Sequence, residues 1–160
     1  MMNERIHNIK KNKELSTPEQ LKSSLEKINL SFSEYKCIDI ISPNLVEVLK
    51  YLKSKNYELG ILTNWFKYTQ EERLKRAGIL KYFDYFVYGE DGLKPTKEAY
   101  LKAIKGYKED ECIIIGDDII NDVLEPLKYG IDTIWFNKKN KENTYNVKEI
   151  KDLIELKKYL

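Results

Sequence analysis

The chain has 160 residues, enough for one main domain, because a domain of this length buries roughly two thirds of its unfolded surface. Its 28 Lys and Arg residues nearly balance 26 Asp and Glu residues, and this interspersed charge of +2 argues against nucleic acid or an anionic membrane as a partner. No apolar run approaches the roughly 18 residues of a membrane helix, and the N-terminus lacks the apolar core of a signal peptide. We therefore expect a cytoplasmic protein, in which Cys37 and Cys112 are reduced structural thiols.

Residues 1–35 have a charged, helical pattern with a clear start signal. Thr17 can cap a helix, Pro18 suits its first position, and Gln20 stands where the side chain of a capping box belongs. One apolar stripe follows at helical spacing, formed by Leu21, Leu25 and Ile28. The pattern predicts a helix with one buried face.

From residue 42 onward, helical and strand-like segments alternate. Apolar periodicity and stop signals predict helices at 43–56, 70–77, 97–105 and 120–129. Short apolar runs predict strands at 57–62, 82–88, 112–115 and 133–136. Strands separated by helices of this length indicate a parallel sheet covered on both faces. After the polar run 137–146, residues 147–160 are predicted to form a terminal amphipathic helix.

Polar side chains follow three of these strands, at the edge of the sheet where α/β proteins bind ligands. They are Thr63 and Asn64, then Lys94, and then Asp117 and Asp118 with Asp122 one helical turn later. Taken singly, each has a structural explanation as a helix cap, a solvated lysine or an acid beside a helix N-terminus. Together, a hydroxyl, an ammonium and a carboxylate cluster are what magnesium-assisted phosphoryl transfer requires.

The order and wording of these motifs resemble the haloacid dehalogenase superfamily. Its apolar strand ending in Ser or Thr is similar to "GILTN", and its lysine before a helix is similar to "DGLKPTKEAY". Its strand followed by Gly-Asp and a further acid resembles "IIIGDDIINDV", and "YGIDTIWFN" matches the trailing glycine and strand. The resemblance implies a Rossmann-like three-layer α/β sandwich with a parallel sheet at residues 41–160, preceded at residues 1–40 by the helical remnant of a cap and a return linker.

The resemblance also implies a role for each polar residue. Thr63, with Asn64 beside it, would hydrogen-bond the transferring phosphoryl group, and Lys94 would neutralise its charge. Asp117 would bind Mg²⁺, with Asp118 as a second or water-mediated ligand, and Asp122 would hold the metal site or Lys94 in place. The implied activity is phosphate hydrolysis on a small phosphorylated metabolite, and dehalogenation is less expected because both acids of the pair 117–118 are retained. The sequence does not specify which metabolite.

The family's first motif, Asp-x-Asp at the end of a strand, has no match in this sequence. That motif supplies the nucleophile, which forms an aspartyl phosphate, and the general acid and base. Asp39 is the one candidate, but Ile41 stands in the place of the second acid, so we interpret Asp39 as part of the return from the cap. In the family the missing strand lies between the strands that end at Thr63 and Asp117. Its absence predicts two unpaired strand edges, which favour self-association or a complementing chain.

Three explanations of the missing motif stay open at this stage. The chain is a fragment, which we favour, or a non-catalytic member that binds a phosphorylated ligand or a protein partner, or one half of a split enzyme. Rival folds fit less well. A receiver domain has its acids at the first strand and its lysine at the last, whereas Lys94 here precedes Asp117, and a dinucleotide-binding domain needs a Gly-x-Gly-x-x-Gly turn that this sequence lacks.

Overall fold

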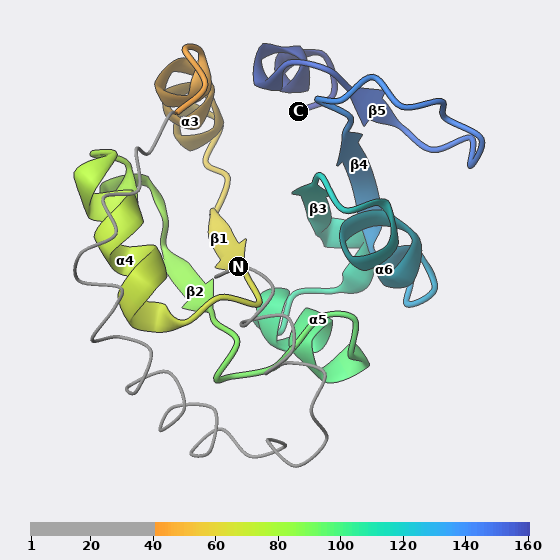
Figure 1. The fold of residues 1–160 in the computed structure, drawn as a ribbon, viewed down its shortest axis with the longest axis horizontal. Helices are drawn as coiled ribbons and strands as arrows, with labels where there is room; N and C mark the ends of the chain where they lie inside the picture. Colours follow the sequence, from red (N-terminus) through yellow and green to blue (C-terminus); the bar gives the residue numbers. More distant parts are fainter. Residues whose placement is uncertain (1–40) are drawn as a thin grey trace, which may run out of the picture. The chain divides into compact units, whose positions relative to one another are not determined.

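The computed structural model describes residues 41–160 (Figure 1). The predicted helices of residues 1–35, the cap remnant 1–40 and Asp39 lie outside the described residues. The α-helices are α3 (Leu45–Ser54), α4 (Lys67–Arg76), α5 (Lys97–Ala103) and α6 (Glu125–Leu127). The strands are β1 (Gly60–Leu62), β2 (Tyr85–Val87), β3 (Ile113–Gly116), β4 (Asp132–Phe136) and β5 (Glu149–Ile150). Short 3-10 turns lie at η2 (Leu80–Tyr82), η3 (Glu109–Glu111) and η5 (Leu153–Lys158), and η4 (Ile119–Leu124) is a π-helix.

Helix α3 shows why the predicted helices form. Val48, Leu49 and Leu52 recur three and four residues apart, and all three are buried. The chain leaves the helix through Asn56, which has a positive φ of 64° and so turns the backbone towards β1. The strand predicted from residue 57 begins only at Gly60. Tyr57 is 39% exposed, and the Glu58 carboxylate accepts a hydrogen bond from the Tyr107 hydroxyl on the surface.

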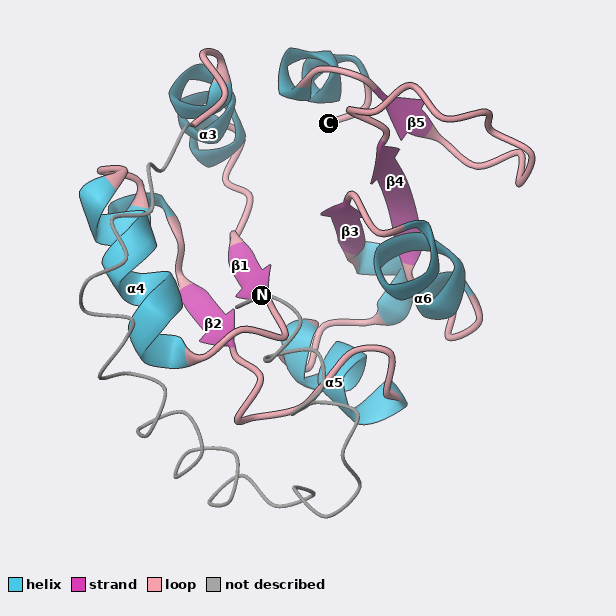
Figure 2. Cartoon of the chain, viewed as in Figure 1, coloured by secondary structure: helices cyan, strands magenta, loops and turns pink. Residues whose placement is uncertain are grey.

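All strand pairs among the described residues are parallel, as predicted. Gly60 of β1 stands opposite Tyr85 of β2, Ile113 of β3 opposite Asp132 of β4, and Trp135 of β4 opposite Glu149 of β5. These pairs make two sheets, β1-β2 and β3-β4-β5 (Figure 2). Within residues 41–160, β1 therefore pairs only with β2, and β3 pairs on one edge only, with β4.

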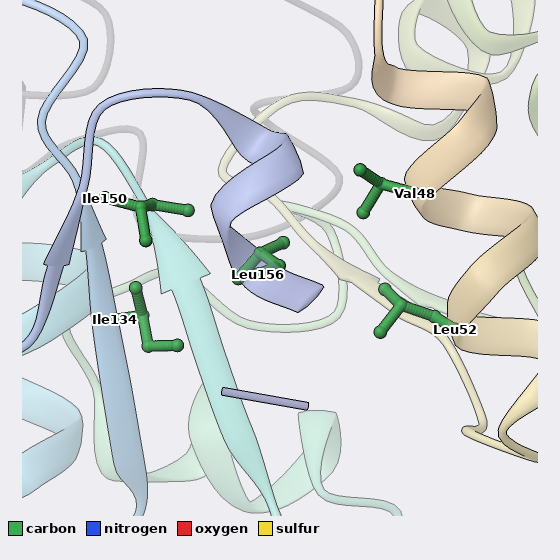
Figure 3. Packing of buried hydrophobic residues seen from close by; sticks show 5 residues of the cluster. All are labelled: Val48, Leu52, Ile134, Ile150 and Leu156. Carbon is green, nitrogen blue, oxygen red and sulfur yellow. The ribbon is translucent and has the colours of Figure 1, made fainter. Parts of the chain in front are cut away.

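Two hydrophobic clusters hold helices against the opposite faces of the strands. The first contains Val48, Leu52, Ile134, Ile150 and Leu156, which come from α3, β4, β5 and η5 (Figure 3). The second joins Tyr100 and Ile104 of α5 to Ile131. Ile113 and Ile115 pack on the first cluster and Ile114 on the second, as the alternation of side chains along a strand requires. Strand β3 is therefore covered on both faces, as expected for the α/β class.

The terminal helix predicted at residues 147–160 is a wrong prediction. Residues 149–150 form β5, and a single 3-10 segment, η5, follows it. Asp152 separates β5 from η5, because it caps the N-terminus of η5. Its side chain accepts a hydrogen bond from Ile154 N and forms a capping box with Glu155. Ile150 on the strand and Leu156 on the turn reach the same cluster, so an apolar pattern at helical spacing is satisfied without a continuous helix.

The helix predicted at residues 120–129 is also divided, into the π-helix η4 and the short helix α6. Gly130, with a φ of 82°, ends this region as the sequence predicted. Among the helices of residues 41–160, none combines the length and the apolar character that a membrane span needs.

Candidate active site

The centre of the candidate site is an ion pair between Lys94, in the loop after β2, and Asp122, on η4. Lys94 Nζ lies 2.5 Å from Asp122 Oδ1, and the two side chains are only 14% and 9% exposed. The two residues are 28 positions apart in sequence, and the fold brings them together. The Lys94 ammonium has three protons, and one of them forms the hydrogen bond to Asp122, which is its one hydrogen bond within residues 41–160. The others remain available to the oxygens of an anion.

Asp122 is fixed in place by the end of β3. Its second oxygen, Oδ2, accepts a hydrogen bond of 3.1 Å from the backbone N–H of Asp118. Gly116 makes room for this carboxylate, because a Cβ at that position would lie 2.3 Å from Asp122 Oδ2. The glycine between the strand and the acids is therefore required by the close approach of a side chain. An ion pair joins Asp122 to Lys94, and the role predicted for Asp122 in the site stays a prediction.

Thr63 presents its hydroxyl as a donor. Its Oγ1 accepts from Trp65 N and from Gln70 Nε2, each at 3.1 Å, and the residue is 9% exposed. A hydroxyl has two acceptor lone pairs and one proton, so both acceptor positions are taken and the proton is the group left to bind a ligand. This arrangement suits the predicted bond from Thr63 to a phosphoryl oxygen. The sequence prediction missed Gln70, which lies on the second turn of α4. Only its hydrogen bond to Thr63, which the structure shows, identifies it as part of the site.

The side chain of Asn64, unlike that of Thr63, binds the backbone of Lys94. Its side-chain Oδ1 accepts from the backbone N–H of Lys94 at 2.7 Å, and its Nδ2 donates to the Lys94 carbonyl at 3.0 Å. The loops that carry the two residues are also joined by Gly89 N, which donates to Trp65 O at 2.9 Å. Gly89 permits this approach, because a Cβ there would lie 2.6 Å from the Asn64 carbonyl oxygen. The loop after β1 is thus bound directly to the loop after β2.

The two consecutive acids after β3, Asp117 and Asp118, differ in the hydrogen bonds that their carboxylates make. Asp118 caps η4: its Oδ1 accepts from the N–H groups of Ile120 and Asn121, and its Oδ2 accepts from the Asn121 amide. Burial acts to raise the pKa of Asp118, but hydrogen bonds from Asn121 and Ile120 and the charge of Lys94 outweigh it, so the pKa falls below its ordinary value. Asp117 is exposed, and within residues 41–160 no hydrogen bond or ion pair engages its carboxylate; its carbonyl accepts from Trp135 Nε1.

These roles decide how well the described residues fit the predicted Mg²⁺. Mg²⁺ takes six oxygen ligands, commonly one or two carboxylates, substrate phosphate oxygens and water. Asp118 is occupied as a cap and Asp122 by Lys94, and within residues 41–160 no three His, Cys, Asp or Glu side chains converge to hold a metal. Asp117 is the carboxylate left to reach a cation. The described residues fit part of a magnesium site, and further oxygen ligands have to come from outside them.

Comparisons with known proteins agree with the fold and the motifs. The chain is 30% identical over 125 residues to the pyrimidine 5′-nucleotidase YjjG of Escherichia coli, covering 71% of this chain and 55% of that protein. It is 31% identical over 130 residues to the glyceraldehyde 3-phosphate phosphatase of Methanothermobacter thermautotrophicus, covering 74% and 58%. The chain thus spans little more than half the length of these relatives.

Solved structures give the same result. A HAD phosphatase from Thermococcus onnurineus superposes with a TM-score of 0.68 at 33% identity, over 74% of this chain and 57% of that one. The putative HAD-hydrolase YfnB from Bacillus subtilis, bound to magnesium, superposes with a TM-score of 0.72 at 21% identity, over 99% and 78%, and so shows the shared fold. Residues 2–136 match the haloacid dehalogenase-like hydrolase family, and the chain belongs to that family.

Proposed function

We propose that this chain is the phosphate-binding part of a magnesium-dependent phosphatase of a small phosphorylated metabolite. The observation that carries the proposal is the Lys94–Asp122 pair. A buried ion pair contributes little to stability on balance, because removing both charges from water costs as much as their attraction returns. A lysine held at 14% exposure beside a carboxylate, with two protons unused within residues 41–160, is suited to an anionic ligand.

The relatives support the substrate class. One is named a pyrimidine 5′-nucleotidase and another a glyceraldehyde 3-phosphate phosphatase, so family members act on different phosphorylated small molecules. In this chain Lys94 and the Thr63 hydroxyl would bind the phosphoryl oxygens, and Asp117 would contribute an oxygen to Mg²⁺. When bound, Mg²⁺ would offset the negative charge of the phosphoryl group.

The nucleophile of this reaction would come from a strand added between β1 and β3. Each of these strands lacks a second neighbour among residues 41–160. Leu62 of β1 and Ile114 of β3 pack on the same hydrophobic cluster, which contains Tyr100, so the two strands approach one common core. We infer that a strand from a segment upstream of this chain, or from a second polypeptide, completes the sheet and carries an Asp-x-Asp sequence at its end.

In the completed site, the first carboxylate of that strand would attack phosphorus, forming a new O–P bond while the P–O ester bond breaks. The leaving oxygen would take a proton from the second acid. Water would then cleave the aspartyl phosphate, releasing inorganic phosphate and restoring the carboxylate. Lys94 and Thr63 stay in place through both steps and stabilise the phosphoryl oxygens.

Two assays on the full chain test this proposal. Calorimetry should detect inorganic phosphate binding, and Lys94→Met should weaken it by about tenfold or more, since a hydrogen bond to a charged group contributes about 1.5–3 kcal/mol. Lys128→Met is the matched control, because Lys128 also pairs with an acid, Glu125, but on an exposed surface. With Mg²⁺ present, the chain should not hydrolyse p-nitrophenyl phosphate above background.

Equal phosphate affinity in the two lysine variants would contradict the binding site. Turnover that disappears in Thr63→Val and Asp117→Asn would contradict the need for an added nucleophile. The alternative is a non-catalytic protein that binds a phosphorylated ligand or a protein partner. It is favoured if the nucleotide sequence before Met1 encodes no strand with Asp-x-Asp and the chain is nevertheless a stable monomer.

A further inference from the structure

We propose that Asn64 is a positioning residue, which holds Lys94 in place through its backbone and does not itself contact the phosphate. This inference rests on the proposed function, because it takes Lys94 as the group that binds the phosphoryl oxygens. It assigns Asn64 a different role from the one implied by the family resemblance, in which Asn64 accompanies Thr63 at the phosphoryl group.

The contacts of the amide carry the argument. Lys94 N, a donor, points at Asn64 Oδ1, and Lys94 O, an acceptor, lies at Asn64 Nδ2, at 2.7 and 3.0 Å. A backbone donor and a backbone acceptor together fix which end of the amide is oxygen and which is nitrogen. The amide therefore meets the Lys94 backbone as a neighbouring strand would, with one donated and one accepted bond.

We call this pair of hydrogen bonds between an asparagine amide and one backbone residue a clasp. The clasp also restrains the charged end of the Lys94 side chain. With both backbone groups of Lys94 bound, the start of its side chain is fixed relative to β1, and Asp122 fixes the ammonium at the other end. The bonds run from Asn64 to Lys94, then to Asp122, and from Asp122 to the backbone of Asp118. These hydrogen bonds connect the three loops that follow β1, β2 and β3, and the Lys94 ammonium is at the centre of the network.

A second asparagine provides a matched control. Asn143 makes the same type of clasp with Val147, donating to its carbonyl at 2.8 Å and accepting from its N–H at 3.5 Å. Both asparagines are partly buried. The loop of residues 143–147 carries none of the candidate site residues, so Asn143→Ala removes a clasp without touching the site.

The test is a double-mutant cycle on inorganic phosphate binding by the full chain, measured by calorimetry. We expect Asn64→Ala to weaken phosphate binding about tenfold, which corresponds to about 1.4 kcal/mol, and Asn143→Ala to leave it unchanged within about twofold. In a Lys94→Met background, Asn64→Ala should cause no further loss, because its effect passes through Lys94. Losses that multiply would show that Asn64 contacts the phosphate directly and would overturn the proposal.

A second readout does not depend on phosphate binding. In protein labelled with ¹⁵N and ¹³C at lysine, Asn64→Ala should shift the Nζ and Cε resonances of Lys94 and speed exchange of its backbone amide, while Asn143→Ala should not. If wild-type protein binds no phosphate, the proposed function fails, and these resonances still decide whether Asn64 positions Lys94. Unchanged Lys94 resonances in a folded Asn64→Ala variant would overturn the positioning role.

Discussion

Strand β4 differs from strands β1 and β3 in burial, although all three are apolar. Thr133, Ile134 and Trp135 of β4 are 3%, 0% and 2% exposed, and β4 has a hydrogen-bonded neighbour on each side. All four residues of β3 are only partly buried, as are Ile61 and Leu62 of β1, and each of these strands has one neighbour among residues 41–160. Apolar composition makes a strand fit for the interior, but its neighbours decide whether it is buried.

This difference matters because the incompletely buried strands are those that lead into the candidate site. Thr63 follows β1, and Asp117 follows β3, whereas β4 carries no candidate residue. Among residues 41–160, β4 has two neighbours and a buried interior, whereas β1 and β3 have one neighbour each and precede the residues to which the proposed function assigns the chemistry. Under the proposed function, a strand added between β1 and β3 would complete both the sheet and the site.

The largest expected effect is on stability, in the interior of β4. Ile134→Ala should lower the free energy of unfolding by about 2–5 kcal/mol, because Ile134 is fully buried and its loss leaves a cavity. Ile114→Ala in β3 removes the same atoms from a partly buried position and should cost less than half as much. Urea unfolding of the two variants measures both values. Equal losses of stability would contradict the difference in burial between β3 and β4.

A smaller effect separates the two acids after β3. Asp118→Ala should lower the free energy of unfolding by about 1 kcal/mol, the usual contribution of a helix N-cap, while Asp117→Ala should change it by less than about 0.5 kcal/mol. The folded-state pKa of Asp118 lies below its ordinary value of 3.8, so its ionised form adds stability that is fully present above that value. This stability is lost as the pH falls from 3.8 through the lowered pKa.

Urea unfolding at pH 6 and at successively lower pH values checks this prediction. The difference between wild type and Asp118→Ala should shrink below pH 4. A difference that stays constant through the acid range would show that the carboxylate of Asp118 is not the capping group.

Much of the fold could be predicted from local pattern. The buried stripe of α3 and the apolar run of β4 each specify their element without reference to distant residues. Strand β5 could not be predicted, because two residues form a strand there only by pairing with the end of β4. The strand predicted at 57–62 is too long for the same reason, since the parallel register with β2 includes only residues 60–62.

In the candidate site, too, local features could be predicted from the sequence and contacts between distant residues could not. The order of strands and polar residues located the candidates at the three strand ends, and the resemblance implied that Asp122 holds the metal site or Lys94 in place. Neither predicted the contacts of Gln70 and Asn64. The Lys94–Asp122 pair, the reach of Gln70 to Thr63 and the clasp of Asn64 on Lys94 all join residues from different loops or turns. Such contacts depend on how the loops pack, which no local pattern contains. The cap formed by Asp118 is the exception, because its partners Ile120 and Asn121 are its near neighbours in sequence.

We propose that a strand from a segment upstream of this chain, or from a second polypeptide, completes the sheet between β1 and β3. Amide hydrogen exchange of the full chain, followed residue by residue by NMR, tests this proposal. Successive residues of a strand direct their N–H groups to opposite sides, so a strand with one neighbour should show alternating slow and fast amides. We expect this alternation in β1 and β3, with rates that differ by about tenfold or more, and uniformly slow exchange in the interior of β4. Uniformly slow exchange in all three strands would show that both edges are already paired in this chain and would contradict the claim.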